Sequence, residues 1–291
     1  MNGAPVTAGP EKLQPPALSG RELRLTYPNG VTALDGLSLQ VAHGEFLAII
    51  GPNGSGKSSL LRTLAGLQPH ASGEVLIEGE LLANLDTRER AKRVALVPQS
   101  LAVLPGYSVE DFVLMGRYAH LSGWRLYSRH DQDVARECLG RVNALGFAHR
   151  GMNEMSGGER QRVMVARALA QEARTVLLDE PTSALDLAHQ LMVYSLIHEM
   201  HRRADKTIVV VTHDLNLASQ FAERLVLLKH GKVAADGSPN EVLRREVLEE
   251  VYGPDLAYGK FEETVSGKPR PWVLPLARRR GRAGDSSDSL S

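Results

Sequence analysis

A glycine-rich stretch that ends in lysine and serine is the part of the sequence best equipped for chemistry. It reads Gly51-Pro52-Asn53-Gly54-Ser55-Gly56-Lys57-Ser58. Glycines at this spacing let backbone N–H groups turn inward on a polyphosphate. Lys57 would then reach the β- and γ-phosphates, and the Ser58 hydroxyl would ligate Mg²⁺. The stretch therefore predicts a nucleoside triphosphate site.

The residues on either side of this loop predict the two elements that would position it. Phe46 to Ile50 is a short apolar run with a β-branched end, which is typical of a buried strand. Helix formers follow from Leu60, so the loop leads into a helix N-terminus, where the positive end of the helix dipole favours phosphate. Because a P-loop requires this strand–loop–helix context, the alternative of a chance glycine-rich turn is disfavoured.

Two carboxylates follow a second apolar strand. Thr175 to Leu178 leads directly into Asp179 and Glu180. At a strand end beside a P-loop, Asp179 can hold Mg²⁺, usually through water. Glu180 is placed to polarise an attacking water, because hydrolysis needs a group that orients and deprotonates it. The alternative is a solvated Asp-Glu turn, which the apolar strand before it disfavours.

A third candidate is the sequence Ser156-Gly157-Gly158, which opens a helical stretch that runs to Gln171. The two glycines expose backbone N–H groups where the helix begins, and Ser156 can both cap the helix and contact a phosphate. An ordinary helix N-cap explains the same residues equally well. These residues alone therefore leave both interpretations open.

The composition is that of a soluble globular protein. The chain has 291 residues, 43% of them hydrophobic and 23% charged, which is enough for a full core. Lys+Arg and Asp+Glu balance at 34 each, so no bulk field favours nucleic acid or an anionic bilayer. The single cysteine, Cys138, excludes an internal disulfide. The apolar runs are too short to span a membrane, and the N-terminus lacks a signal-peptide pattern, so we expect a cytoplasmic protein.

Strands that alternate with helices through the second half of the chain predict a parallel sheet with right-handed crossovers. Glu22 to Val41 instead shows short strands around an Asn29-Gly30 turn, which predicts an antiparallel β-layer. The fold class is therefore α/β, with a mostly parallel core sheet, an antiparallel β-subdomain and an inserted helical subdomain. We expect a disordered leader over residues 1–18, one domain over 19–265 with its helical subdomain at about 100–170, and a C-terminal extension over 266–291, disordered from about 277.

Taken in order, these motifs resemble the nucleotide-binding subunit of an ATP-binding cassette (ABC) transporter, a P-loop NTPase, across about residues 20–250. The motifs that carry the resemblance are Tyr27, the Walker A loop 51–58, Gln99 in Val97-Pro-Gln-Ser, the signature Ser156–Gln161, Walker B at 176–180, Ser183–Asp186 as D-loop, and His213. One departure is Met155, where the family usually has leucine; it keeps the apolar bulk.

The resemblance implies a role for each of these residues. Tyr27 would stack on adenine, Gln99 would sense Mg²⁺ and the attacking water, and His213 would contact the γ-phosphate. In such cassettes two subunits pack head to tail, so Ser156 and Gly158 would act in trans on the γ-phosphate held by the P-loop of the other subunit. The catalytic set is then Glu180, His213 and Gln99, and the metal set is Ser58, Gln99 and Asp179. The residues expected to bind ATP are Tyr27, Gly51, Pro52, Asn53, Gly54, Ser55, Gly56, Lys57, Ser58, Ser59, Ser156, Gly157, Gly158 and Asp186.

Four further segments resemble importers of iron–siderophore, haem and vitamin B12. They are 115–120, 153–162, 185–190 and 237–243. This resemblance implies an ATP hydrolase that powers import through a separate membrane permease, with a substrate-binding protein as an indirect partner and no nucleic acid. It would act as a homodimer on the cytoplasmic face of the plasma (inner) membrane. The alternatives are another ABC importer, such as one for zinc or manganese, or a soluble ABC ATPase without a transport role.

Aromatic and apolar side chains between residues 100 and 127 could receive a cytoplasmic helix of the permease. They are Leu104, Tyr107, Tyr118 and Trp124. The resemblance implies a docking groove in this region, and large aromatic side chains are suited to anchor a partner. The same residues could equally form the core of the helical subdomain, and the sequence leaves both interpretations open.

Overall fold

A six-stranded sheet forms the centre of the protein. The computed structural model describes residues 14–68, 72–100, 106–121, 126–183, 185–204, 206–262 and 269–276. The sheet has the order β10-β9-β3-β8-β7-β6. Its strands are β3 (Phe46–Ile50), β6 (Val94–Val97), β7 (Thr175–Asp179), β8 (Thr207–Val211), β9 (Arg224–Lys229) and β10 (Lys232–Gly237). All neighbouring pairs are parallel except β9 and β10, so the predicted mostly parallel core sheet is confirmed.

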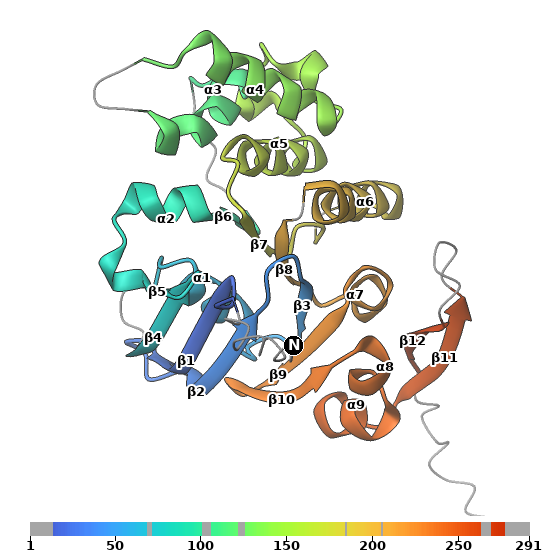
Figure 1. Cartoon of the computed structure of the whole chain (residues 1–291). Coiled ribbons are helices and arrows are strands. Elements are labelled where there is room, and N and C mark those ends of the chain that lie inside the picture. Colours follow the sequence, from blue (N-terminus) through green and yellow to red (C-terminus); the bar gives the residue numbers. More distant parts are fainter. Residues whose placement is uncertain are drawn as a thin grey trace, which may run out of the picture.

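A second, antiparallel sheet forms the β-layer beside this core (Figure 1). Its strands are β1 (Leu18–Thr26), β2 (Thr32–Val41), β4 (Ser72–Ile77) and β5 (Glu80–Leu81), in the order β2-β1-β4-β5. The turn between β1 and β2 contains Gly30 at φ 83°, a conformation that glycine adopts at no steric cost. Helix α2 (Thr87–Arg93) follows β5 and ends where β6 begins.

The helical subdomain is inserted between β6 and β7. It contains α3 (Val109–Leu114), a 3₁₀ segment at Met115–His120, α4 (Arg129–Arg141), short 3₁₀ turns at Leu145–Phe147 and Met152–Glu154, and α5 (Gly157–Ala170). Ser108, Ser128 and Ser156 each cap a helix with a reciprocal capping box. In Figure 1, α5 lies between the α3–α4 pair and the strands of the core sheet.

The two faces of the core sheet are covered by different helices. Along β3, Leu47 and Ile49 pack in the same cluster as the leucines of α1 (Lys57–Leu64). Phe46, Ala48 and Ile50 point the other way and pack in the cluster that contains the buried face of α5. Since successive side chains of a strand point to opposite faces, α1 and α5 lie on opposite faces of the sheet.

The C-terminal part of the chain continues around the sheet edge. Helices α6 (Leu187–Ala204) and α7 (Leu215–Phe221) join the parallel strands, and α8 (Pro239–Val242) and α9 (Arg245–Tyr252) follow β10. A hairpin of β11 (Leu256–Glu262) and β12 (Pro269–Pro275) closes the described part and packs on α7. There, Ser219 Oγ donates to the carbonyl of Pro271 at 2.6 Å.

The structure differs from the predicted boundaries at both ends. The leader was predicted to include Leu18, but Leu18 is fully buried in β1, and Ala17 beside it is 1% exposed. At the C-terminal end, strand β12 lies in the predicted extension over 266–291 but packs on α7. The predicted disorder of residues 1–13 and 277–291 lies outside the described residues. The domain limits themselves stay predictions.

Candidate nucleotide site

The P-loop between β3 and α1 is tightly packed against the backbone of neighbouring strands. Gly51, Gly54 and Gly56 have φ values of 145°, 78° and 101°. A Cβ on Gly51 would overlap the carbonyl oxygen of Leu228, and one on Gly56 would overlap that of Ala33. Only glycine therefore fits these two positions, which fixes the path of the loop and the direction of its N–H groups.

Lys57 lies inside this loop. Its Nζ donates to the carbonyl oxygens of Gly51 at 2.8 Å and Pro52 at 2.9 Å. Burial lowers the pKa of Lys57, and the charges of Glu180 and Asp179 oppose that shift. Ser55 Oγ is also buried here and has no hydrogen-bond partner within the described residues. An ammonium and an unpaired buried hydroxyl at the N-terminus of a helix fit a polyphosphate.

Ser58 and Asp179 are brought together although 121 residues separate them in the chain. Ser58 Oγ donates to Asp179 Oδ1 at 2.8 Å. Burial raises the pKa of Asp179, opposed by this hydrogen bond and by Arg62. Hard oxygen donors of this type, a hydroxyl and a carboxylate, are the ligands that Mg²⁺ prefers. The predicted metal residues Ser58 and Asp179 therefore fit that ion.

Arg62 is a neighbour of the site that the sequence interpretation missed. Its Nη2 lies 3.8 Å from Asp179 Oδ2. Residue 62 is four positions after Ser58 on α1, so both side chains share one face of the helix. That spacing was the signal that could have identified it.

Gln99, Glu180 and His213 meet at the carboxyl ends of β6, β7 and β8. Gln99 Nε2 donates to Glu180 Oε2 at 2.8 Å, and His213 Nδ1 lies 3.6 Å from the same oxygen. Glu180 has a positive φ of 46°, and its N–H donates to the carbonyl of Val211 at 2.9 Å. Ligand sites of parallel sheets lie at this edge, outside the carboxyl ends of the strands. The structure thus gathers all three residues that were predicted to act in catalysis.

Tyr27 lies beside the helix that follows the P-loop. Its hydroxyl forms a hydrogen bond of 3.0 Å with Ser59 Oγ on α1, and the partly buried ring packs against the core of the β-layer. This contact attaches the β1–β2 turn to α1, the helix that follows the P-loop. Stacking of the ring on adenine stays a prediction.

Ser156 caps α5. Its Oγ accepts from the N–H of Glu159 at 3.3 Å, and its own N–H donates to Glu159 Oε2 at 2.8 Å. Ser156 and Gly157 are exposed to solvent. Among the described residues, no hydrogen bond or ion pair joins the Ser156–Gly158 segment to the P-loop. The ordinary N-cap is therefore present, and phosphate binding by the same residues stays a prediction.

Asp186 is held at the start of α6. Its Oδ1 accepts from His189 N at 2.9 Å and lies 2.8 Å from His189 Nδ1. The backbone hydrogen bond from His189, followed by that from its ring, lowers the pKa of Asp186. Asp186 is exposed, so its carboxylate remains accessible from outside.

The predicted docking aromatics are exposed where the structure describes them. Tyr107 is 43% and Tyr118 58% exposed, so neither is part of the helical core. Leu104 and Trp124 lie outside the described residues. Within the described residues, no helix combines the length and apolar composition needed to cross a bilayer.

Comparison with known proteins agrees with this geometry. The chain is 36% identical to the ferric enterobactin transport ATP-binding protein FepC of Escherichia coli, over 90% of this chain and 94% of that protein. It is 44% identical to the hemin import ATP-binding protein HmuV of Streptomyces coelicolor, over 82% and 86% of the two chains. It is 35% identical to the cobalamin import ATP-binding protein BtuD of Halobacterium salinarum, over 89% of this chain and 63% of that protein.

Solved structures show the same fold. A chain of an ABC transporter described as of metal-chelate type, in an inward-facing conformation, superposes with a TM-score of 0.77 at 31% identity, covering 90% of this chain and 98% of that one. The dimeric, post-hydrolysis cassette MJ0796 bound to ADP and Pi gives 0.71 at 33% identity, covering 76% and 98%. The ABC transporter family profile matches residues 34–183. The chain therefore belongs to the ABC transporter family, as one of its ATP-binding, ATP-hydrolysing subunits.

Proposed function

We propose that this chain is the ATPase subunit that powers import of an iron chelate, haem or vitamin B12 through a separate membrane permease. The observation that carries the ATPase part is the position of Glu180 beside the P-loop, where Gln99 and His213 contact its carboxylate. The names of the relatives, which transport ferric enterobactin, hemin and cobalamin, support the cargo group.

The P-loop side of the site binds the triphosphate. Backbone N–H groups of the glycine-rich loop would contact the phosphates, and Lys57 can exchange its two carbonyl partners for β- and γ-phosphate oxygens. Ser58, Asp179 and Gln99 would hold Mg²⁺, which when bound neutralises charge on the β- and γ-phosphates. The ring of Tyr27 stacks on the adenine base. Ser59 steadies Tyr27 through their shared hydrogen bond.

Glu180 acts on the water that attacks the γ-phosphorus. Its carboxylate accepts a proton from that water, and the Gln99 amide fixes one of its oxygens. His213 is close enough to Glu180 to share this region and contacts the γ-phosphate. Because phosphoryl transfer depends mainly on positioning and charge, holding these groups at three adjacent strand ends is what the reaction requires.

The second anion site serves another copy of the chain. Helix α5, which Ser156 caps, packs on the opposite face of the sheet from α1, and no hydrogen bond or ion pair of the described residues joins its cap to the P-loop. Ser156 to Gly158 then contact the γ-phosphate held by a partner subunit, and Asp186 lies at the same interface. The dimeric state of the cassette MJ0796 supports a pairing of two subunits.

A role in transport also requires partners in the membrane and outside it. The homodimer binds integral-membrane permease subunits and is peripheral to the cytoplasmic face of the plasma (inner) membrane. A substrate-binding protein takes part indirectly, by delivering cargo to the permease. Tyr107 and Tyr118, both exposed, lie on the surface that receives the permease.

Replacing Glu180 tests the reaction. Glu180→Gln keeps the size and one hydrogen-bond acceptor but cannot take a proton, so ATP should still bind while turnover falls by at least 100-fold and closed dimers accumulate. Glu74→Gln, at an exposed position of β4, is the matched control and should hydrolyse ATP normally. Normal hydrolysis by Glu180→Gln would refute the assigned role.

Reconstitution tests the cargo. The membrane subunits that co-purify with the chain would be placed in liposomes, and ATPase activity measured with a ferric siderophore, haem, vitamin B12, Zn²⁺ or Mn²⁺ delivered to the permease. Stimulation by one of the first three supports the proposal. Stimulation by Zn²⁺ or Mn²⁺ alone would contradict it.

A further inference from the structure

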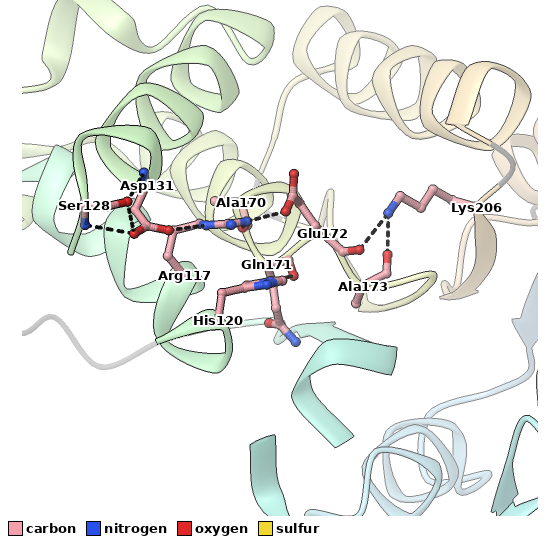
Figure 2. A network of polar contacts seen from close by, with 9 residues as sticks. All are labelled: Arg117, His120, Ser128, Asp131, Ala170, Gln171, Glu172, Ala173 and Lys206. Carbon is pink, nitrogen blue, oxygen red and sulfur yellow. Dashed lines mark hydrogen bonds and ion pairs between the residues drawn. The ribbon is translucent and has the colours of Figure 1, made fainter. Parts of the chain in front are cut away.

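A row of polar contacts crosses the C-terminal end of α5. We call it the α5 joint; it consists of Arg117, Asp131, Gln171, Glu172 and Lys206. Figure 2 shows these side chains in sequence from α4 on one side to the segment before β8 on the other, with the end of α5 between them. The joint therefore connects the helical subdomain with the core sheet.

Arg117 forms the helical side of the joint. Its side chain is 4% exposed. Nε donates to Asp131 Oδ1 at 3.1 Å, and Nη1 donates to the carbonyl of Ala170 at 2.8 Å. Asp131 is in turn fixed by Ser128, whose N–H and hydroxyl both donate to Oδ2. A buried guanidinium held by several acceptors has one direction available to it, because any other would leave a charge unpaired.

Two other side chains attach the same helix end to the core. Gln171 Nε2 donates to the carbonyls of Ala91 at 2.5 Å and Val94 at 2.9 Å, which belong to α2 and β6. Lys206, just before β8, donates to the carbonyls of Glu172 at 3.1 Å and Ala173 at 2.6 Å. The segment after α5 is thus fixed to the core at the start of β6 and just before β8.

Glu172 is where the two sides meet. Its side chain accepts from Arg117 Nη1 at 2.6 Å, while its backbone carbonyl accepts from Lys206. Its φ of 55° turns the chain sharply away from α5. One residue therefore carries a contact to the helical subdomain through its carboxylate and a contact to the core through its backbone.

We propose that the Arg117–Glu172 contact is a positioning contact that sets the direction of α5 and so places Ser156 and Gly158 against the phosphate held by a second copy. This inference rests on the proposed function. Helix α5 has 14 residues, so Ser156 lies about 21 Å from the joint. A tilt of α5 by about 10° at the joint moves Ser156 by roughly 3–4 Å. Because a hydrogen bond spans about 3 Å, this shift is enough to break one.

A purely structural ion pair would give a different result on mutation. It would lower stability without changing how two loaded subunits associate. A positioning contact instead changes association while leaving ATP binding by the monomer intact, because the contacts of the α5 joint given above involve no residue of the P-loop. Dimer formation and monomer binding therefore separate the two roles.

The test uses Glu180→Gln as parent, since it should trap the ATP-loaded dimer. Glu172→Ala and Glu172→Gln are added to it. Glu80→Ala is the matched control, because Glu80 and Glu172 have similar surroundings. Glu80 is 46% exposed and accepts from Arg93 at 2.8 Å; Glu172 is 50% exposed and accepts from Arg117 at 2.6 Å. Sedimentation gives the protein concentration at which half the chains are dimeric with ATP, and calorimetry gives the ATP affinity of dilute monomer.

Glu172→Ala should raise the half-dimer concentration about tenfold, and Glu172→Gln, which keeps an acceptor, by less. Monomer ATP affinity should stay within twofold in both. The inference is overturned if Glu172→Ala dimerises within twofold of Glu80→Ala, or if its monomer loses ATP affinity to the same extent. If the parent forms no ATP-dependent dimer, the in-trans site itself is wrong and the inference falls with it. If Glu172→Ala does not fold, Glu172→Gln decides by the same comparisons.

Discussion

Substitutions at Tyr27 separate two roles of this side chain, a hydrogen bond to Ser59 and stacking on adenine. Its hydroxyl shares a hydrogen bond of 3.0 Å with Ser59 Oγ, and its ring is predicted to stack on adenine. Tyr27→Phe removes only the hydroxyl and Tyr27→Ala removes the ring as well. The two variants should therefore affect stability and nucleotide affinity in different proportions.

The expected sizes follow from the contacts. Losing one neutral, part-buried hydrogen bond costs about 0.5–1.5 kcal/mol of unfolding free energy, so Tyr27→Phe should lose this stability and keep its nucleotide affinity. Ser59→Ala removes the other partner and should match it in stability. Stacking of a base on an aromatic ring contributes about 1–3 kcal/mol, so Tyr27→Ala should weaken ADP binding roughly 5- to 150-fold.

Calorimetric titration with ADP and with inorganic pyrophosphate provides the assay. Pyrophosphate has the phosphates without the base, so Tyr27→Ala should bind it as the unmodified protein does. Equal losses of ADP and pyrophosphate affinity would show that Tyr27 acts through the P-loop rather than on adenine. Unchanged ADP affinity in Tyr27→Ala would refute the stacking role outright.

Three further predictions follow from the same geometry. Ser156→Arg should abolish hydrolysis but leave ATP binding by the monomer nearly unchanged in calorimetry; loss of monomer binding would argue against an in-trans site. A cysteine at Tyr107 should cross-link to the permease in the assembled transporter, and a functional complex with no cross-link would exclude docking there. Burial alone would raise the pKa of Asp131, but hydrogen bonds from Ser128 and Arg117 lower it from 3.8 to about 2. The resulting stabilisation is complete above pH 3.8 and lost as the pH falls to 2, so the stability difference between the unmodified protein and Asp131→Asn in urea should shrink by on the order of 1–2 kcal/mol from pH 5 to pH 2. A difference that stays constant would contradict it.

The elements that present the site were accessible from the sequence because each is encoded locally. A charged run at 87–93 passes directly into four apolar residues, and the structure has α2 and β6 there. The apolar runs before Glu180 and His213 likewise form β7 and β8. Since parallel strands end at one edge of a sheet, predicting three such strands is already a prediction that the residues after them meet.

Other features of the fold depend on contacts between distant residues, which no local sequence pattern predicts. The hairpin β11–β12 was missed because β12 contains Pro269, Pro271 and Pro275, and proline argues against a central strand. In a two-stranded sheet every strand is an edge, so the prolines are tolerated. The pair Arg117–Glu172 joins residues 55 positions apart, and neither residue stands out in the sequence. Only the folded chain shows that both face the end of α5.

The P-loop and the Ser156–Gly158 segment, which is predicted to be a second anion site, are held in physically different ways. The carbonyl oxygens of Ala33 and Leu228 pack so closely against the P-loop that Gly56 and Gly51 have no room for a Cβ. Ser156 instead caps a helix whose other end is held by contacts of the Arg117 side chain with the Ala170 carbonyl and with Glu172. If the proposed function holds, we expect a permease that shifts the helical subdomain to change hydrolysis more than it changes ATP binding.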